Sequence, residues 1–397
     1  MTIGNLHRLT RRGALALGVG LAVSAAMPLQ ANAAELVIGV INPLTGPGAD
    51  LGLAGKQGLD PVISRINAAG GINGMKIRVI YRDDQSNPQK GVAAALELIN
   101  RHRVDIIMGA NLTHVAFAVS PMINKAKVPF IVFGTGSALI NVKRFPYSFR
   151  FNMSTGVEAA VITRHVVLMR KHMRPGLLVD RTALGQSGRR ALETALTKYK
   201  IKPVGVETFA MSDTDMTGQL IKLRNAKADV VLVWGLGPML AHAARSAERI
   251  GYKAPVYGGI GMHQSAFLKL AGPAGAKWSA TFFRSFTRAE GAPAAYNVQA
   301  YVKELEGVYG KGVSSSNMIS AVWFDAMNAL AAAVKGAKSK KGEAIRAALE
   351  RIKGYKGLMS TYTFSPTDHD GFDPRDTTLA FALGVKRSIR LRVPNAP

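Results

Sequence analysis

The sequence contains no cysteine. Disulfide bonds and thiolate metal sites are therefore excluded, and so is a lipid anchor carried on a cysteine side chain. A chain without these supports relies on its hydrophobic core for stability. With 397 residues, 48% of them hydrophobic, it is long enough for two domains that each bury a full core.

Long hydrophobic runs are also missing after the N-terminal region. No later stretch reaches the ~18 unbroken apolar residues that indicate a transmembrane helix. At the N-terminus, Arg8, Arg11 and Arg12 precede an apolar run at 13–26, and "ANA" at 31–33 has the form that a signal peptidase cuts after. This pattern is typical of a secretory signal peptide over residues 1–33. We therefore expect a periplasmic protein that is free in solution and is not a lipoprotein. The segment "TRRGAL" leaves both the Sec and the twin-arginine export routes open.

Acidic residues are scarce. The chain has 25 Asp and Glu against 51 Lys and Arg, for a net charge of +26. Residues 1–33 contribute three arginines and no acid, which leaves +23 on the remainder. Such a charge suggests an anionic partner. Because the basic residues are scattered, with no run of five and no aromatic–basic RNA motif, we do not expect nucleic acid to be that partner.

Complete catalytic and metal-binding motifs are absent. The segment "GPGADL" lacks the third glycine of a dinucleotide fingerprint, and "ADLGLAGKQG" lacks the spacing of a phosphate loop. Ser137 in "GTGSAL" is not on a nucleophile elbow, and no H-E-x-x-H occurs. The segment "DHDG" at 368–371 lacks the spacing of a calcium loop, and we interpret it as a solvated turn. We expect no catalytic site, no metal and no cofactor.

The stretch "INAAGGINGMKIRVIYRDDQSNP" (66–88) combines turn signals with a doubled carboxylate. Gly70–Gly71 predicts a helix end, and Asn73–Gly74 predicts a tight turn. Neighbouring side chains of a strand point to opposite faces, so at most one of Asp83 and Asp84 can belong to a site. We favour a capping role, with Asp84 and Ser86 at the start of the next helix.

Strand-like and helix-like segments alternate along the chain. Strands are predicted within 35–46, 75–84, 104–111, 128–136, 176–180, 202–210, 228–235 and 254–261. Helices are predicted over 52–69, 89–100, 115–126, 156–172, 187–199, 217–226 and 238–251. This alternation favours parallel sheets with crossover helices, in two series that divide near Phe151. Ligands of such sheets bind outside the carboxyl ends of the strands. The loops expected there follow Ile41, Gly109, Phe133, Val179, Val233 and Gly259.

Six segments occur in an order that resembles a known family. They are "IGVINPLTGPGADLG", "INAAGGINGMKI", "RDDQSNP", "IMGAN", "VPFIVFGTG" and "ADVVLVWG". Together they resemble the branched-chain amino acid (Leu/Ile/Val) type of periplasmic solute-binding protein, which serves ABC importers. The resemblance covers essentially all of the chain after residue 33. It implies a monomer that works with a membrane permease and an ATPase.

The resemblance also implies a fold. The expected class is α/β, with two doubly wound parallel-sheet lobes joined by a three-stranded hinge, the type I periplasmic binding protein fold. Residues 34–152 and 285–361 would form lobe 1, and residues 153–284 and 362–397 would form lobe 2. The hinge crossings would fall near 151–154, 283–286 and 361–365.

Relatives hold a ligand carboxylate with hydroxyl and backbone N–H groups that match "GANLT" and "FGTGS" here. Thr113 matches the first hydroxyl, and Gly136 matches the second, with Thr135 and Ser137 beside it. An anion at strand ends and helix N-termini meets unpaired N–H donors. The alternative for Thr113 is an N-cap of the following helix. The ligand-binding residues implied are Leu51, Asn111, Leu112, Thr113, Gly134, Thr135, Gly136, Ser137, Leu184, Leu236 and Ile260.

Two departures from the family bear on the ligand. Amino-acid-binding relatives carry an acid for the ligand ammonium where this chain has Ile260, and no Asp or Glu lies between 251 and 289. Leu51, Leu184 and Leu236 stand where aromatic residues are frequent. A buried ammonium without a partner costs several kcal/mol. Either another group supplies the charge, or the ligand is an apolar or aromatic acid without an ammonium, which these residues favour.

Other function classes remain open from the sequence. A secreted sensory domain would bind ligand without a transporter, and a secreted enzyme could use the same scaffold. The missing nucleophile–base motif argues against the enzyme.

Overall fold

The computed structural model describes residues 35–287, 296–310 and 318–381. The expected signal peptide at 1–33 and the C-terminal residues 382–397 lie outside these ranges. Among the described helices, none combines the length and the apolar character needed to cross a membrane.

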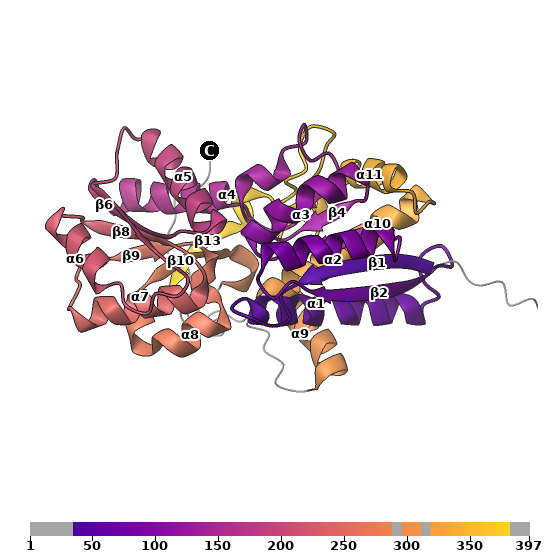
Figure 1. Ribbon diagram of the computed structural model, residues 1–397, viewed down its shortest axis with the longest axis horizontal. Helices are drawn as coiled ribbons and strands as arrows, with labels where there is room; N and C mark the ends of the chain where they lie inside the picture. Colours follow the sequence, from indigo (N-terminus) through magenta and orange to yellow (C-terminus); the bar gives the residue numbers. More distant parts are fainter. Residues whose placement is uncertain (1–34, 288–295, 311–317, 382–397) are drawn as a thin grey trace, which may run out of the picture. The chain divides into compact units, whose positions relative to one another are not determined.

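The first sheet is parallel, with strand order β2-β1-β3-β4-β5. Its elements are β1 (Glu35–Asn42), α1 (Ala49–Ala68), β2 (Lys76–Asp83), α2 (Pro88–Asn100), β3 (Ile106–Gly109), α3 (Thr113–Lys125), β4 (Phe130–Val132), the 3₁₀ turn η1 (Ser137–Ile140) and β5 (Ser148–Arg150). Residues 36–42 of β1 are buried because the strand is internal and helices cover both faces. In Figure 1, α1 and α2 lie on opposite sides of the β1–β2 pair.

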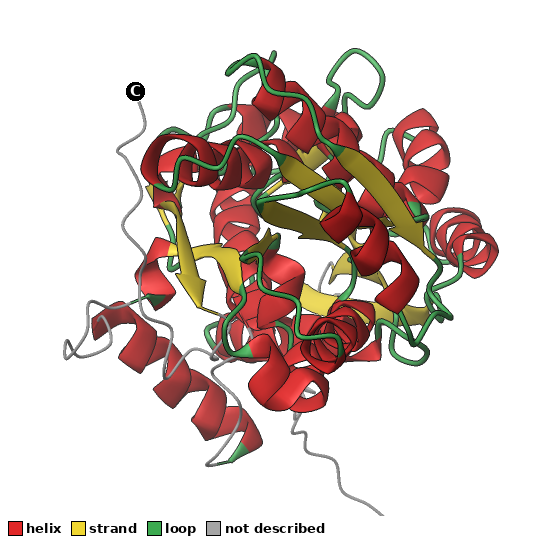
Figure 2. Cartoon of the chain, turned by 90° about the vertical axis from the view of Figure 1, so that its left-hand side faces the viewer, coloured by secondary structure: helices red, strands yellow, loops and turns green. Residues whose placement is uncertain are grey.

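The second sheet has strand order β13-β10-β9-β8-β6-β7 and is parallel except for β13, which runs antiparallel to β10. Its elements are α4 (Thr155–Arg164), β6 (Pro175–Asp180), α5 (Ala183–Thr197), β7 (Gly205–Phe209), α6 (Thr217–Asn225), β8 (Val230–Trp234), α7 (Gly237–Arg249), β9 (Val256–Gly258), η3 (Ile260–His263), α8 (Ser265–Ala271), η4 (Gly272–Gly275), β10 (Ser279–Phe283), η5 (Arg284–Phe286), η6 (Pro374–Asp376) and β13 (Thr377–Phe381). Helices flank the strands on both sides, as Figure 2 shows. The predicted α/β architecture of two parallel-sheet units is confirmed.

The helix predicted over 156–172 is shorter than expected. It ends at Arg164 and continues as a π-helical turn, η2 (His165–Met169). Apolar periodicity does not distinguish the two helix types, because buried residues recur on one face of both.

The remaining elements return to the first sheet. They are α9 (Tyr296–Tyr309), α10 (Met318–Ala337), α11 (Gly342–Glu350), β11 (Tyr355–Lys356) and β12 (Thr361–Tyr362). The longest of them, α10, packs along α1. In the described chain, residues 151–154 and residues 363–376, between β12 and β13, run from one sheet to the other. The chain also passes from β10 of the second sheet to α9, and residues 284–287 are the described part of that passage.

The turn-rich stretch at 66–88 connects α1, β2 and α2. Gly70 and Gly71 have φ values of 98° and 87° and end α1, and Asn73–Gly74 forms the tight turn between Ile72 and Met75. The capping prediction for Asp84 and Ser86 was wrong, because the Asn87 side chain accepts from the N–H groups of Gln89 and Lys90.

The two carboxyl groups of that stretch, Asp83 and Asp84, have different structural roles. Asp83 accepts from the backbone of Leu44, Thr45 and Gln85 and thereby ties the loop after β1. Asp84 is fully buried, and burial raises the pKa of its carboxyl to about 7. They are therefore separate structural groups and not an acid–base pair.

The segment 368–371 is not a solvated turn, which corrects the interpretation of "DHDG". Residues 369–371 pair with β5, through the N–H of Arg150 to the carbonyl of His369 and the N–H of Gly371 to the carbonyl of Arg150. The His369 ring is buried and stacks on Phe149. Within the described ranges, no group of three or more His, Asp or Glu side chains has the arrangement of a metal site.

Candidate functional site

A pocket lies where the loops after β3, β4, β8 and β9 meet the first turn of α4. This is the carboxyl-end position expected for a ligand of parallel sheets. Eight residues proposed from the resemblance line it: Leu51, Asn111, Leu112, Thr113, Thr135, Leu184, Leu236 and Ile260. Gly134, Gly136 and Ser137 are not among the lining residues.

Thr113 is the first residue of α3, and its side chain is only 2% exposed. The N-cap of this helix is Leu112, and no side chain caps it. The N-cap alternative for Thr113 is therefore wrong. Its Oγ1 is buried with no hydrogen-bond partner among the described residues. A free hydroxyl beside the unpaired N–H groups of a helix start is a favourable environment for an anion.

The loop after β4 brings Thr135, and not Gly136, to the pocket. A side chain at Gly136 would press on Thr113, since its Cβ would lie 2.7 Å from the Thr113 methyl carbon. The Ser137 hydroxyl is engaged elsewhere, with Thr155 Oγ1 at 3.0 Å and the N–H of Gly156 at 3.0 Å. Ser137 therefore joins this loop to the start of α4.

The apolar wall contains two aromatic residues that the sequence analysis missed. Phe133 directly follows β4 and stacks on Trp323 of α10, with ring centroids 3.8 Å apart. Trp234 ends β8 and is 3% exposed. Both positions were in predicted strands, at the carboxyl ends where ligands bind, and that was the available signal. The pocket thus offers aromatic as well as leucine surface.

Glu158 supplies the acid that the sequence analysis found missing. It lies in the first turn of α4, is 1% exposed and lines the pocket. Its Oε2 accepts from the N–H of Ile260 at 2.7 Å and from Thr281 Oγ1 at 2.5 Å. Of the two alternatives that Ile260 left open, this contact favours the first, because a carboxyl group reaches this position from a different element.

The environment of Glu158 also sets its protonation. Burial raises the pKa of its carboxyl to about 7, since desolvation outweighs the two hydrogen bonds and the nearby charge of Arg150. A bound cation would favour the ionised form. Near neutral pH the Glu158 carboxyl is thus present both in its protonated form, which can donate a hydrogen bond, and in its ionised form.

Asn111 and Asn152 line the pocket but serve mainly its framework. The Asn111 amide donates to Asn42 Oδ1 and to the carbonyl of Leu51, and so fixes the segment that carries Leu51. The Asn152 amide donates to the carbonyl of Phe133. These bonds hold the apolar wall in place, and they leave the hydroxyl of Thr113 and the carboxylate of Glu158 facing the ligand space.

Comparison with known proteins identifies the family. A family model described as periplasmic binding protein matches residues 35–375. The chain belongs to this family. The family consists of binding proteins, and its members are periplasmic.

Two curated relatives are similar to this binding protein. The Leu/Ile/Val-binding protein homolog 3 of Brucella melitensis is 28% identical over 60% of this chain. An amino acid binding protein of Pseudomonas aeruginosa is 29% identical over 62% of this chain. The alignment spans 65% of the length of each of these relatives.

Solved structures establish the fold. A type 1 periplasmic binding protein from Bordetella pertussis superposes with a TM-score of 0.79 at 24% identity, covering 91% of this chain and 100% of that one. The substrate-binding protein LivJ of Streptococcus pneumoniae, in complex with isoleucine, superposes with a TM-score of 0.77 at 22% identity and the same coverage. A solute-binding protein from R. palustris, in complex with 4-hydroxybenzoate, gives 0.74 at 19% identity, covering 87% and 92%. The binding protein therefore has the type I periplasmic binding protein fold.

Proposed function

We propose that this protein is the solute-binding component of an ABC importer and that it captures a small carboxylate with an apolar body. The observation that carries the proposal is the buried hydroxyl of Thr113 at the start of α3, which has no hydrogen-bond partner in the described part of the chain. Burying a hydroxyl without a hydrogen bond costs free energy, and a ligand carboxylate would remove that cost. Thr135 and the first N–H groups of α3 provide further donors nearby.

The ligand class that fits the pocket best is an α-amino acid with an apolar or aromatic side chain. Its carboxylate would contact Thr113, its ammonium would pair with Glu158, and its side chain would lie on Phe133, Trp234 and the leucines. Similarity to Leu/Ile/Val-binding and amino acid binding proteins supports this choice. An apolar or aromatic acid without an ammonium is the competing ligand, and it would favour a protonated Glu158.

We further propose that the two sheets are the cores of two lobes that close on the ligand about a hinge. Of the described residues, 35–152 and 285–371 would belong to the first lobe, and 153–284 with 372–381 would belong to the second. Because residues 369–371 pair with β5, we place the last boundary after Gly371 and not at 362. Export by the predicted signal peptide at 1–33, a monomeric state, and a permease and an ATPase as partners complete the proposal.

Substitution of Thr113 by valine tests the carboxylate site. Valine has the same shape, so Thr113→Val should lower the affinity for L-leucine or L-phenylalanine by about 1–3 kcal/mol, measured by titration calorimetry. Thr163→Val is the matched control, because the Thr163 hydroxyl is also buried without a partner but does not line the pocket.

Neither substitution removes a hydrogen bond within the described structure, and each removes a buried hydroxyl without a partner there, so both variants should melt at or above the temperature of the wild type. Equal affinity of the two variants for both ligands would refute the assignment of the carboxylate site.

A further inference from the structure

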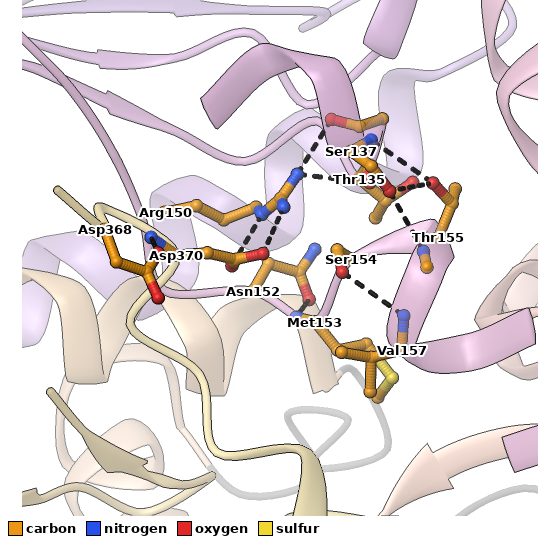
Figure 3. A network of polar contacts seen from close by, with 12 residues as sticks. Thr135, Ser137, Arg150, Asn152, Met153, Ser154, Thr155, Val157, Asp368 and Asp370 are labelled. Carbon is orange, nitrogen blue, oxygen red and sulfur yellow. Dashed lines mark hydrogen bonds and ion pairs between the residues drawn. The ribbon is translucent and has the colours of Figure 1, made fainter. Parts of the chain in front are cut away.

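Arg150 is a fully buried cation at the end of β5. Its guanidinium forms a two-bond ion pair with Asp370, with Nε at 3.0 Å from Oδ1 and Nη2 at 2.6 Å from Oδ2. Such fork-to-fork pairing fixes orientation as well as charge. Its remaining nitrogen, Nη1, points away from this carboxylate (Figure 3).

Nη1 donates to three successive backbone carbonyls of the loop after β4. The acceptors are Gly136 at 2.9 Å, Thr135 at 3.1 Å and, more weakly, Gly134 at 3.5 Å. Carbonyl oxygens that converge on one point repel each other unless a cation lies between them. The guanidinium therefore holds the shape of the loop that brings Thr135 into the pocket.

The same loop is bound to the start of α4, on the side of the second sheet. The carbonyl of Thr135 accepts from the N–H of Thr155 at 2.9 Å. Ser137 Oγ contacts Thr155 Oγ1, which in turn lies 3.0 Å from Ser187 Oγ of α5. Figure 3 shows Arg150 and Thr155 on either side of this loop. The loop thus lies between the ion pair and the helix that carries Glu158.

The partner of Arg150 in the ion pair, Asp370, lies on the last connection between the two sheets. It belongs to residues 363–376, which run from β12 to β13. We propose that Arg150 is a positioning residue for ligand binding, which links this connection to the pocket loop at 134–136 through Asp370. The inference rests on the proposed function of the pocket. Stability alone is a weak reason for such a group, because buried ion pairs often add little to it.

Asp370→Asn is the informative variant, because it removes the charge pair but leaves Arg150 in place. Its control is Asp373→Asn, since Asp373 lies on the same connection and pairs with the exposed Arg375. Calorimetry with L-leucine and L-phenylalanine should show weaker binding by Asp370→Asn, by at least about fivefold, the low end of coupling between sites. Asp373→Asn should bind like the wild type.

Asp370→Glu should restore part of the affinity, because a carboxylate returns to the pair. Hydrogen–deuterium exchange without ligand gives an independent measurement. Amides of residues 134–137 should exchange faster in Asp370→Asn and at the wild-type rate in Asp373→Asn. Arg150→Lys should resemble Asp370→Asn, since an ammonium lacks the fork that spans both partners.

The outcomes separate this inference from the proposed function. If the wild type binds an amino acid probe and Asp370→Asn binds it equally well, Arg150 does not position the pocket, even if the melting temperature falls. If the wild type binds neither probe, the proposed ligand class is wrong. In that case the exchange rates decide, and an unchanged rate at 134–137 in Asp370→Asn overturns the inference.

Discussion

Thr113 and Glu158 are both buried in the pocket wall, but their polar atoms differ in their hydrogen-bonding partners and in the charge they can bind. The Thr113 hydroxyl has no partner among the described residues and can donate to an anion. Glu158 accepts two hydrogen bonds at Oε2 and, when ionised, is stabilised by a cation. At the scale of single residues, this difference supports the proposal of a ligand that carries both charges.

The pH dependence of binding distinguishes the two ligand classes. Burial raises the pKa of Glu158 to about 7, so the carboxylate forms as the pH rises through neutrality. In the proposed pairing leucine needs the ionised form, so its affinity should fall by up to about tenfold per pH unit below 7. The affinity for 4-methylpentanoate should instead increase on acidification, because the pocket loses a repelling charge. Calorimetry between pH 5.5 and 8.5 measures both.

Glu158→Gln should remove this pH dependence and weaken leucine binding by about 2–5 kcal/mol. Asp84→Asn is the control, because Asp84 is also a buried carboxyl with its pKa raised to about 7, but it does not line the pocket. If the wild type bound 4-methylpentanoate more tightly than leucine at every pH, the ligand would be an acid without an ammonium.

These two residues also show what a sequence discloses about a site. Thr113 was identified because it lies in a segment that resembles other proteins. Glu158 was missed because it occupies the first turn of α4, where an acid is explained by the helix dipole alone. Its contact with Ile260 joins residues 102 positions apart, and no local pattern encodes such a contact.

At the scale of elements, the close crossing of α1 and α10 supports one wall of the pocket. A Cβ added at Gly58 would lie 1.9 Å from the carbonyl oxygen of Ser320, and one at Gly55 would lie 2.7 Å from the ring of Trp323. Trp323 in turn stacks on Phe133 in the pocket. Glycine at these helix positions is therefore a requirement of packing.

Gly58→Ala tests this crossing. Alanine favours a helix by up to about 1 kcal/mol, yet here it must push α10 away, which typically costs about 1–3 kcal/mol. We expect a net loss of stability in urea denaturation. Gly307→Ala in α9 is the control, because its Cβ would meet no atom within 4 Å, and it should be neutral or stabilising. A gain in stability for both variants would mean that the crossing relaxes freely.

Periodic signals explain which elements were predictable. Buried strands such as β1 and β8 are continuous apolar runs, and in the helices between them apolar residues recur every three or four positions. Both kinds of element were therefore found from the sequence. The pairing of residues 369–371 with β5 was not, because polar segments such as "DHDG" carry no periodicity. The ion pair between buried Arg150 and partly exposed Asp370 was missed for the same reason.

At the scale of the whole molecule, the chain connects its two sheets through residues 151–154, through the segment from β10 to α9, and through residues 363–376. The pocket takes Thr113 and Thr135 from loops of the first sheet, and Trp234 and Ile260 from loops of the second. A ligand that contacts both sets gains most when they approach each other. Binding should therefore shift the lobes towards a closed arrangement, as in other hinged proteins.

The absence of cysteine makes the proposed closure directly measurable. Introduced cysteines are then the sole labelling sites, and Ala93 of α2 and Arg190 of α5 are exposed positions on elements of different sheets. Fluorescence energy transfer between dyes on Ala93→Cys and Arg190→Cys should increase when L-leucine saturates the protein. The control pair, Ala93→Cys with Lys125→Cys of α3, lies on elements of the first sheet alone and should show no change.

Adding Thr113→Val should move the response of the first pair to higher leucine concentration without changing its final amplitude, because the substitution weakens binding but leaves the hinge intact. An unchanged signal at saturation, with binding verified by calorimetry in the same labelled protein, would mean that the ligand enters a preformed pocket and that the connections between the sheets do not act as a hinge.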